Sequence, residues 1–164
     1  MEKNPLFSGK QIARGGIIAA LYVVLTYASY TMNLSGQLAV QLRLSEALTV
    51  LPYFTAAAIP GLTIGCLLAN LITGAVIWDV IFGTLATLLG AIGTYLLRKY
   101  RYAASLPPIV FNTLIIPFVL TYAYQLPDGI PLLALSVAIG EIICCGMLGT
   151  LLQAALLRYP KLFE

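Results

Sequence analysis

Long apolar runs, interrupted by short polar or turn-forming stretches, make up most of this 164-residue sequence. A helix needs about 20 predominantly apolar residues to cross about 30 Å of hydrocarbon. The pattern predicts an all-α integral membrane protein, a six-transmembrane-helix bundle that forms a single domain over residues 1–164. The predicted helices are Ile12–Thr31, Ser45–Ala58, Leu62–Ile77, Val80–Leu97, Leu106–Tyr124 and Leu132–Leu157.

Short stretches between these runs carry their own signals. From Gln37 to Ser45, apolar and polar residues alternate, which is typical of an extended segment. We expect this outer loop to fold back over the mouth of the bundle. Ser45 is placed to cap the helix that follows, with Glu46 near its positive end.

Two further breaks and a kink are predicted from residue types. Ile59-Pro60-Gly61 is typical of a turn, and Trp78-Asp79 forms a polar, aromatic break before the fourth helix. Pro117 predicts a kink in the fifth helix because proline cannot donate the helical hydrogen bond.

Composition agrees with a membrane protein and excludes several functions. The chain is 60% hydrophobic and only 9% charged, with a mean hydropathy of +0.95. Histidine is absent, no phosphate-binding loop occurs, and the three cysteines match neither a zinc site nor a disulfide framework. We therefore expect no enzyme activity, no catalytic residue, no metal and no cofactor. With no basic block, we also expect no nucleic-acid partner.

The positive charges predict the orientation in the membrane. Six spans place both termini on one side, and basic residues collect on the cytoplasmic side of membrane proteins. Eight of the nine basic residues fall on the terminal side, so both termini are predicted to be cytoplasmic. They are Lys3, Lys10, Arg14, Arg98, Lys99, Arg101, Arg158 and Lys161. Only Arg43 falls on the opposite side.

Charged residues at membrane depth point to a functional site. Counting about 1.5 Å per helical residue places Glu46, Asn70 and Glu141 at a similar depth, with Arg43 just above them. The short second helix and the folded-back loop predict a concavity that opens outward. The same count places Asn112 near the inner end of its helix, outside this pocket.

Trp78 and Asp79 are predicted near the outer surface, at the entrance. The acidic residues outnumber Arg43 on this side, so either one carboxyl group is protonated or a cationic or donor-rich ligand completes the site. A flat heterocycle with several N–H donors would suit carboxylate, amide and indole partners.

Structural roles are open for the same residues. Arg43 could form an ion pair with Glu46 or with Glu141, and Asn70 could serve as an interhelical hydrogen-bond donor. Asp79 could cap the fourth helix while Trp78 lies in the aromatic belt at the membrane surface.

Small residues recur four apart on the first helix, at Gly15 and Ala19 and at Gly16 and Ala20. Such pairs let another helix approach closely. The partner helix could belong to this chain or to another protein.

Several motifs together resemble a known family. They are Gln41-Leu-Arg43-Leu-Ser45-Glu46-Ala-Leu-Thr49-Val-Leu-Pro52, Ala58-Ile-Pro60-Gly61 with Gly65-Cys-Leu-Leu-Ala69-Asn70, Asp79-Val-Ile-Phe-Gly83-Thr-Leu-Ala-Thr87, Leu106-Pro-Pro108-Ile-Val-Phe-Asn112 and Gly140-Glu141. Nearly end to end, the chain resembles the QueT family, the queuosine-precursor substrate-binding (S) components of energy-coupling factor (ECF) transporters.

The resemblance implies a substrate-capture subunit in the bacterial plasma membrane. Its implied partners are a transmembrane coupling subunit, two ATP-binding-cassette (ABC) ATPases and the lipid bilayer, and its implied cargo is a deazaguanine base. Gly16 and Ala20 match the Ala-x-x-x-Ala face by which S components dock, with glycine in place of the first alanine. Alternatives are an S component for another vitamin or nucleobase, a stand-alone proton-coupled carrier using Glu46 or Glu141, and a membrane scaffold without transport.

Overall fold

All regular secondary structure in the described part of the chain is helical. The computed structural model describes residues 8–34, 42–159 and 162–163. In chain order the elements are α1 (Gly9–Thr31), η1 (Leu44–Tyr53), α2 (Ala58–Ile72), α3 (Ile77–Leu96), η2 (Arg101–Ala103), α4 (Leu106–Tyr122), α5 (Ile130–Glu141), η3 (Ile142–Leu148) and α6 (Gly149–Leu156). Of these, η1 and η2 are 3₁₀ helices and η3 is a π-helix that joins α5 to α6.

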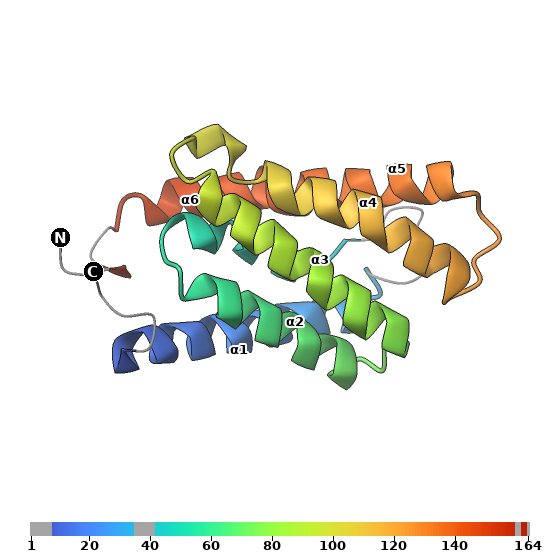
Figure 1. The fold of residues 1–164 in the computed structure, drawn as a ribbon, viewed down its shortest axis with the longest axis horizontal. Helices are drawn as coiled ribbons and strands as arrows, with labels where there is room; N and C mark the ends of the chain where they lie inside the picture. The colour runs from blue at the N-terminus through green and yellow to red at the C-terminus, as the bar shows by residue number, and fades with distance from the viewer. Residues whose placement is uncertain (1–7, 35–41, 160–161, 164) are drawn as a thin grey trace.

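The helices run back and forth along one axis and form a bundle (Figure 1). Four stretches are long and apolar enough to cross a membrane: Gly9–Thr31, Ile77–Leu96, Arg101–Tyr122 and Ile130–Leu156. The shorter passes are η1 and α2. The six predicted helices therefore fit one bundle, in which the start of α1 and the end of α6 lie at the same end (Figure 1). There, Arg14 Nη1 donates to Phe163 O over 2.9 Å.

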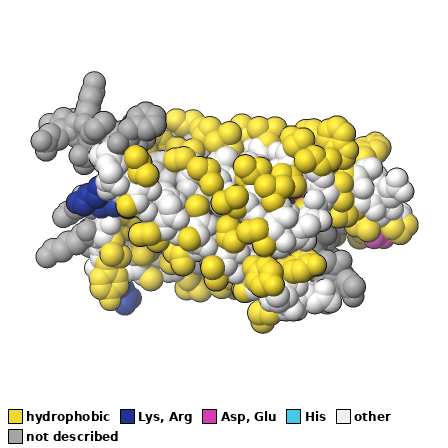
Figure 2. Space-filling view, turned by 90° about the horizontal axis from the view of Figure 1, so that it is seen from below, with side chains coloured by type: hydrophobic (Ala, Val, Ile, Leu, Met, Phe, Trp, Pro, Cys, Tyr) yellow, Lys and Arg dark blue, Asp and Glu magenta, His cyan; other side chains and the backbone are white. Residues whose placement is uncertain are grey.

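The molecular surface is apolar between two polar ends. Figure 2 shows hydrophobic side chains along the length of the bundle, basic side chains at one end and an acidic side chain at the other. Large side chains such as Val24, Leu71, Leu114 and Leu151 are 55% or more exposed. Because lipid covers such side chains without the cost that water would impose, this surface fits a membrane.

Glycines bring α1 and α2 unusually close together. A Cβ atom on Gly61 would lie 2.7 Å from the carbonyl oxygen of Gly15. A Cβ on Gly65 would lie 2.8 Å from Tyr22 Cβ and 3.0 Å from Ala19 O. The Gly15 and Ala19 pair is thus packed inside this protein, as one of the two predicted alternatives had it.

The second predicted helix, Ser45–Ala58, is wrong in type and extent. Residues Leu44–Tyr53 form a 3₁₀ helix that contains Pro52, and seven of them are buried. Ser45 does not cap it, because the helix already begins at Leu44. The Ser45 Oγ instead accepts a hydrogen bond from Thr26 Oγ1 at 2.8 Å. A ten-residue 3₁₀ helix is long for its kind, and such stretches often mark a functional segment.

Two predicted breaks are also helical. Pro60 lies in the first turn of α2, where the missing N–H has no helical partner to lose. Trp78 and Asp79 lie in the first turn of α3. The break between α2 and α3 falls earlier, at Gly74, whose φ of +70° requires glycine-like freedom.

The predicted extended loop lies mostly outside the described residues. Residues 35–41, which include Gln37 and Gln41, are not among the described residues. Within the described part, Arg43 has extended backbone angles, with φ −114° and ψ 103°.

Candidate functional site

A cavity of about 380 Å³ lies among the helices. This volume falls within the usual range for small-molecule sites. The connections that follow α1, α2 and α4 lie at the end of the bundle opposite the termini (Figure 1). They contribute six lining residues: Asn33, Thr73, Gly74, Ala75, Tyr124 and Leu126. The other lining residues include four charged side chains and two amides: Arg43, Glu46, Asp79, Glu141, Asn70 and Asn112. The cavity therefore extends to the end of the bundle that is predicted to face outward.

Four of these lining residues form an outer polar group: Arg43, Asn70, Asp79 and Tyr124. Arg43 Nη2 donates to Asn70 Oδ1 at 2.5 Å. Asn70 Nδ2 approaches the backbone oxygen of Asp79 at 3.4 Å, and Tyr124 Oη donates to Asp79 Oδ2 at 3.0 Å. The group joins the residue before η1 to α2, α3 and the α4–α5 connection.

The hydroxyl of Tyr124 remains a donor at neutral pH. Burial, together with the neighbouring Asp79 carboxylate, raises the pKa of Tyr124 to about 12. The same hydroxyl accepts a bond from the backbone N–H of Val76 at 3.4 Å. Tyr124 thus fastens the α4–α5 connection to the start of α3.

Deeper in the bundle lies an inner acidic group, formed by Tyr22, Glu46, Asn112, Glu141 and Cys145. Asn112 Nδ2 donates to Glu141 Oε1 at 2.9 Å and approaches Glu46 Oε2 at 3.5 Å. Tyr22 Oη donates to Glu46 Oε1 at 2.5 Å, and Cys145 Sγ donates to Glu141 Oε2 at 3.0 Å. Each carboxylate oxygen therefore has a neutral donor.

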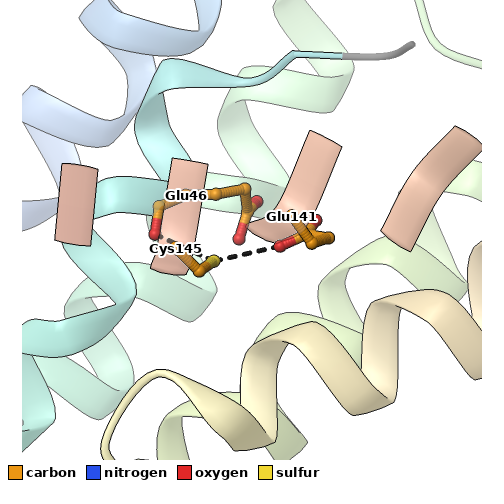
Figure 3. A group of neighbouring side chains, drawn as sticks. All are labelled: Glu46, Glu141 and Cys145. Atoms are coloured by element: carbon orange, nitrogen blue, oxygen red, sulfur yellow. Dashed lines mark hydrogen bonds between the residues drawn. The ribbon is translucent and has the colours of Figure 1, made fainter. Parts of the chain in front are cut away.

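The two carboxyl groups of the inner acidic group lie close together. One ligand atom each from Glu46, Glu141 and Cys145 lies within 4.8 Å of the others (Figure 3). These three could hold a metal ion, although the hydrogen bonds already satisfy the same atoms without one. Two unit negative charges about 5 Å apart repel by roughly 3 kcal/mol at an effective dielectric constant of about 20. A proton or a cation must offset that repulsion.

Five of the six predicted substrate-binding residues line the cavity together: Arg43, Glu46, Asn70, Asp79 and Glu141. Trp78 does not line it. The Trp78 side chain is 54% exposed and its ring stacks on Phe82, with the centroids 6.1 Å apart.

The predicted ion pair of Arg43 is replaced by another contact. In the described part of the chain, the Arg43 guanidinium is hydrogen-bonded to Asn70 and is paired with neither Glu46 nor Glu141. The role predicted for Asn70 as an interhelical donor is present, since its Nδ2 on α2 approaches the backbone oxygen of Asp79 on α3.

The prediction that Asn112 lies outside the pocket is wrong. Asn112 is 5% exposed, lines the cavity and bridges both carboxylates. The depth count assumed that all helices start in one plane. The connection containing η2 occupies the end of the bundle, so α4 begins deeper than α3 ends (Figure 1).

Two positioning residues were not predicted from the sequence. Tyr22 is fully buried and Cys145 is 2% exposed, and neither lines the cavity. A signal for Cys145 exists, because it follows Glu141 by four residues and so lies on the same helical face. For Tyr22, the only signal is a polar aromatic residue in an apolar span.

A second surface of interest lies on α1. Gly16 and Ala20 are exposed on the side of this helix that does not face α2. A Cβ placed on Gly16 would meet nothing within 4 Å. The two predicted small-residue pairs therefore differ, one packed internally and one exposed.

Comparison with known protein families matches residues 12–158 to the family described as QueT transporter. The matched range includes every residue that lines the cavity. The chain belongs to the QueT transporter family. This QueT transporter is a multi-pass plasma-membrane protein and the substrate-binding (S) component of a transporter. Comparison with curated proteins and with solved structures finds no match.

Proposed function

We propose that this QueT transporter chain captures a deazaguanine precursor of queuosine from outside the cell and delivers it inward as the S component of an ECF-type importer. The observation that carries the proposal is the cavity of about 380 Å³, which offers donors and acceptors inside an apolar bundle. A guanine-like heterocycle presents both kinds of group along its edge. The family match supports the transport role.

In this proposal the lining residues have different roles in binding the ligand. Asn70 and Glu141 form hydrogen bonds with the edge of the heterocycle. Arg43 and Glu46 line the side of the pocket that η1 forms. Asp79 shapes the entrance through its bond to Tyr124. Asn112 joins this set because it bridges the two carboxylates. Trp78, on the lipid-exposed surface, serves as a membrane-surface anchor instead.

The energy for transport comes from partner subunits in this proposal. The chain has no phosphate-binding loop, and we propose that it is not an enzyme. The exposed Gly16 and Ala20 surface on α1 supports docking of a transmembrane coupling subunit, which two ABC ATPases energise. The basic end of the bundle faces the cytoplasm.

One observation favours a second candidate, a stand-alone proton-coupled carrier. Glu46 and Glu141 lie close together and are buried, an arrangement that can hold and release a proton. Reconstitution separates the two functions. The purified chain alone in vesicles with a pH gradient should not move ligand, whereas addition of the coupling subunit, the ATPases and ATP should start uptake. Uptake by the chain alone would replace the importer proposal.

Ligand binding is tested directly on the purified chain. A thermal-shift titration with deazaguanine bases should raise the unfolding temperature, because a ligand that binds only the folded state stabilises it. Adenine, which presents a different pattern of donors and acceptors, is the matched control. No shift with any deazaguanine base would contradict the proposed cargo and leave another vitamin or nucleobase.

A further inference from the structure

The connection between α3 and α4, residues 97–105, is rich in basic and aromatic side chains and is called the basic connection below. Five consecutive residues in it are exposed: Arg98, Lys99, Tyr100, Arg101 and Tyr102. Arg98 Cζ lies 4.3 Å from the centroid of the Tyr95 ring, and Arg101 Cζ lies 5.9 Å from that of the Tyr102 ring. A guanidinium over a ring face is oriented by the ring, and its N–H donors remain available to an anion.

No acidic side chain in the described part of the chain balances this charge. The four described acidic residues lie elsewhere, three along the cavity and one in the α4–α5 connection at the opposite end of the bundle: Glu46, Asp79, Glu141 and Asp128. The start of α1 and the end of α6 bring further basic residues to the same end as the basic connection: Lys10, Arg14 and Arg158. This end therefore presents a positive surface (Figure 2).

The basic connection lies where the head groups of lipids are expected. α3 is long and apolar enough to cross a membrane, and its last residue, Leu96, is exposed. Arg98 follows two residues later, which is about 3 Å at 1.5 Å per helical residue. On the other side, the exposed Leu106 begins α4. Tyrosine and basic side chains that flank apolar spans are typical of the membrane interface, where the phosphates of lipids lie.

The basic connection is held in one conformation by close packing of its two helices. A Cβ atom on Gly93 would lie 2.6 Å from Pro107 Cβ, so α3 and α4 touch directly before and after the connection. Thr94 Oγ1 also donates to the backbone oxygen of Ala104 over 2.8 Å. A surface that is already ordered loses less entropy on binding than a flexible basic tail would.

We propose that the basic connection binds the head group of an anionic phospholipid, with Arg98 and Arg101 as donors to its phosphate. Guanidinium groups suit phosphate because their paired N–H groups match its oxygens. A lipid fits this place better than soluble phosphate does, because the exposed Leu96 and Leu106 flank the arginines and can contact acyl chains. The site is separate from the cavity and does not depend on the cargo.

The test measures lipid binding to the purified chain in a neutral detergent by native mass spectrometry. The wild type should bind phosphatidylglycerol at least about tenfold more tightly than phosphatidylcholine, whose phosphate is balanced by its own cation. Arg98→Gln/Arg101→Gln should weaken phosphatidylglycerol binding by roughly 30-fold, which corresponds to about 1 kcal/mol for each arginine. Equal binding of the two lipids by the wild type would overturn the proposal.

A second double substitution controls for charge alone. Lys10→Gln/Arg158→Gln removes the same charge from the same end of the bundle and should weaken binding by less than about threefold. An equal loss in both double variants would mean that diffuse surface charge attracts the lipid, and the proposal would be wrong. Unfolding midpoints without added lipid report whether each variant is folded. If the arginine double variant is unfolded, Arg98→Gln alone takes its place, with an expected loss of about fivefold.

Two further measurements separate the lipid from other anions and partners. Inorganic phosphate should not displace phosphatidylglycerol, and displacement at low millimolar phosphate would assign the arginines to a soluble ligand instead. Co-purification of the arginine double variant with the coupling subunit should match the wild type. Loss of that subunit with unchanged phosphatidylglycerol binding would assign the basic connection to a protein partner and overturn the proposal.

Discussion

The hydroxyl of Tyr22 lies 2.5 Å from Glu46 Oε1, although the tyrosine does not reach the cavity. Cys145 has the same relation to Glu141, at 3.0 Å. Each acidic side chain thus has one oxygen bonded to a residue outside the cavity lining and the other oxygen directed toward Asn112. Their rotamers are set before any ligand arrives, which reduces the entropy that binding must overcome.

Replacement of Tyr22 tests this support. Tyr22→Phe keeps the ring and removes the donor, leaving a buried carboxylate oxygen without its partner. We expect the folded protein to lose about 1–3 kcal/mol of stability, measured by unfolding in detergent. Tyr27→Phe, on the exposed side of α1, is the matched control and should have no effect. Equal stability of Tyr22→Phe and the wild type would contradict a supporting role.

At the scale of residues, the sequence predicted the positions of the charged side chains better than it predicted their hydrogen-bond partners. Charge in an apolar run is conspicuous, so Glu46 and Glu141 could be predicted at a similar depth, with Arg43 just above them. Asn112 could not, because its depth depends on where α4 begins, which a local residue count does not determine. Tertiary contact alone makes Tyr22 a partner of Glu46.

At the scale of elements, the contact between α1 and α2 depends on glycine. Gly65→Ala would place a methyl group 2.8 Å from Tyr22 Cβ, and neither backbone can yield easily. Overpacking of this kind costs about 1–3 kcal/mol, which exceeds the roughly 0.5–1 kcal/mol that alanine gains in a helix. We expect a lower thermal unfolding midpoint in detergent.

Gly16→Ala provides the comparison for that substitution. It makes the same chemical change on an exposed position of α1, where the added methyl group meets nothing within 4 Å. Its unfolding midpoint should be unchanged or higher. If both variants lose the same stability, helix packing is not the cause.

The long apolar runs predicted the extents of α1, α3 and α4 to within a few residues, because hydrophobic length determines a membrane helix. Prediction failed where proline or a short run leaves several backbone geometries open. Pro52 lies inside a 3₁₀ helix and Pro60 inside the first turn of α2, and no local pattern distinguishes these from turns. The π-helix at Ile142–Leu148 likewise has no signal in its apolar sequence.

For the whole molecule, the proposed docking surface on α1 can be separated from the cavity. Gly16→Leu adds bulk to the exposed side of α1 without contacting the lining residues. We expect it to reduce co-purification with the coupling subunit by at least about tenfold, a loss of about 1.4 kcal/mol or more, while deazaguanine affinity stays unchanged. Ala155→Leu, exposed on α6, is the control and should co-purify normally. Normal assembly of Gly16→Leu would exclude this surface as the interface.

The shortness of α2 has a consequence for the membrane itself. Fifteen residues extend about 22 Å, whereas the 23 residues of α1 extend about 34 Å. With Leu67 and Leu71 exposed along α2, a span this short is matched by local thinning of the bilayer beside the helix.

The elastic energy of the deformed bilayer therefore contributes to the free energy of the folded bundle, and it does so mainly beside α2. Thermal stability should be greater in vesicles of shorter acyl chains than in thicker ones, and Leu67→Ser, which shrinks the apolar face of α2 further, should steepen that dependence. Stability independent of chain length would show that the mismatch is absorbed elsewhere. A bundle with one short side deforms the membrane locally. Any rotation that moves α2 relative to the bilayer therefore changes the size of that deformation and its energy.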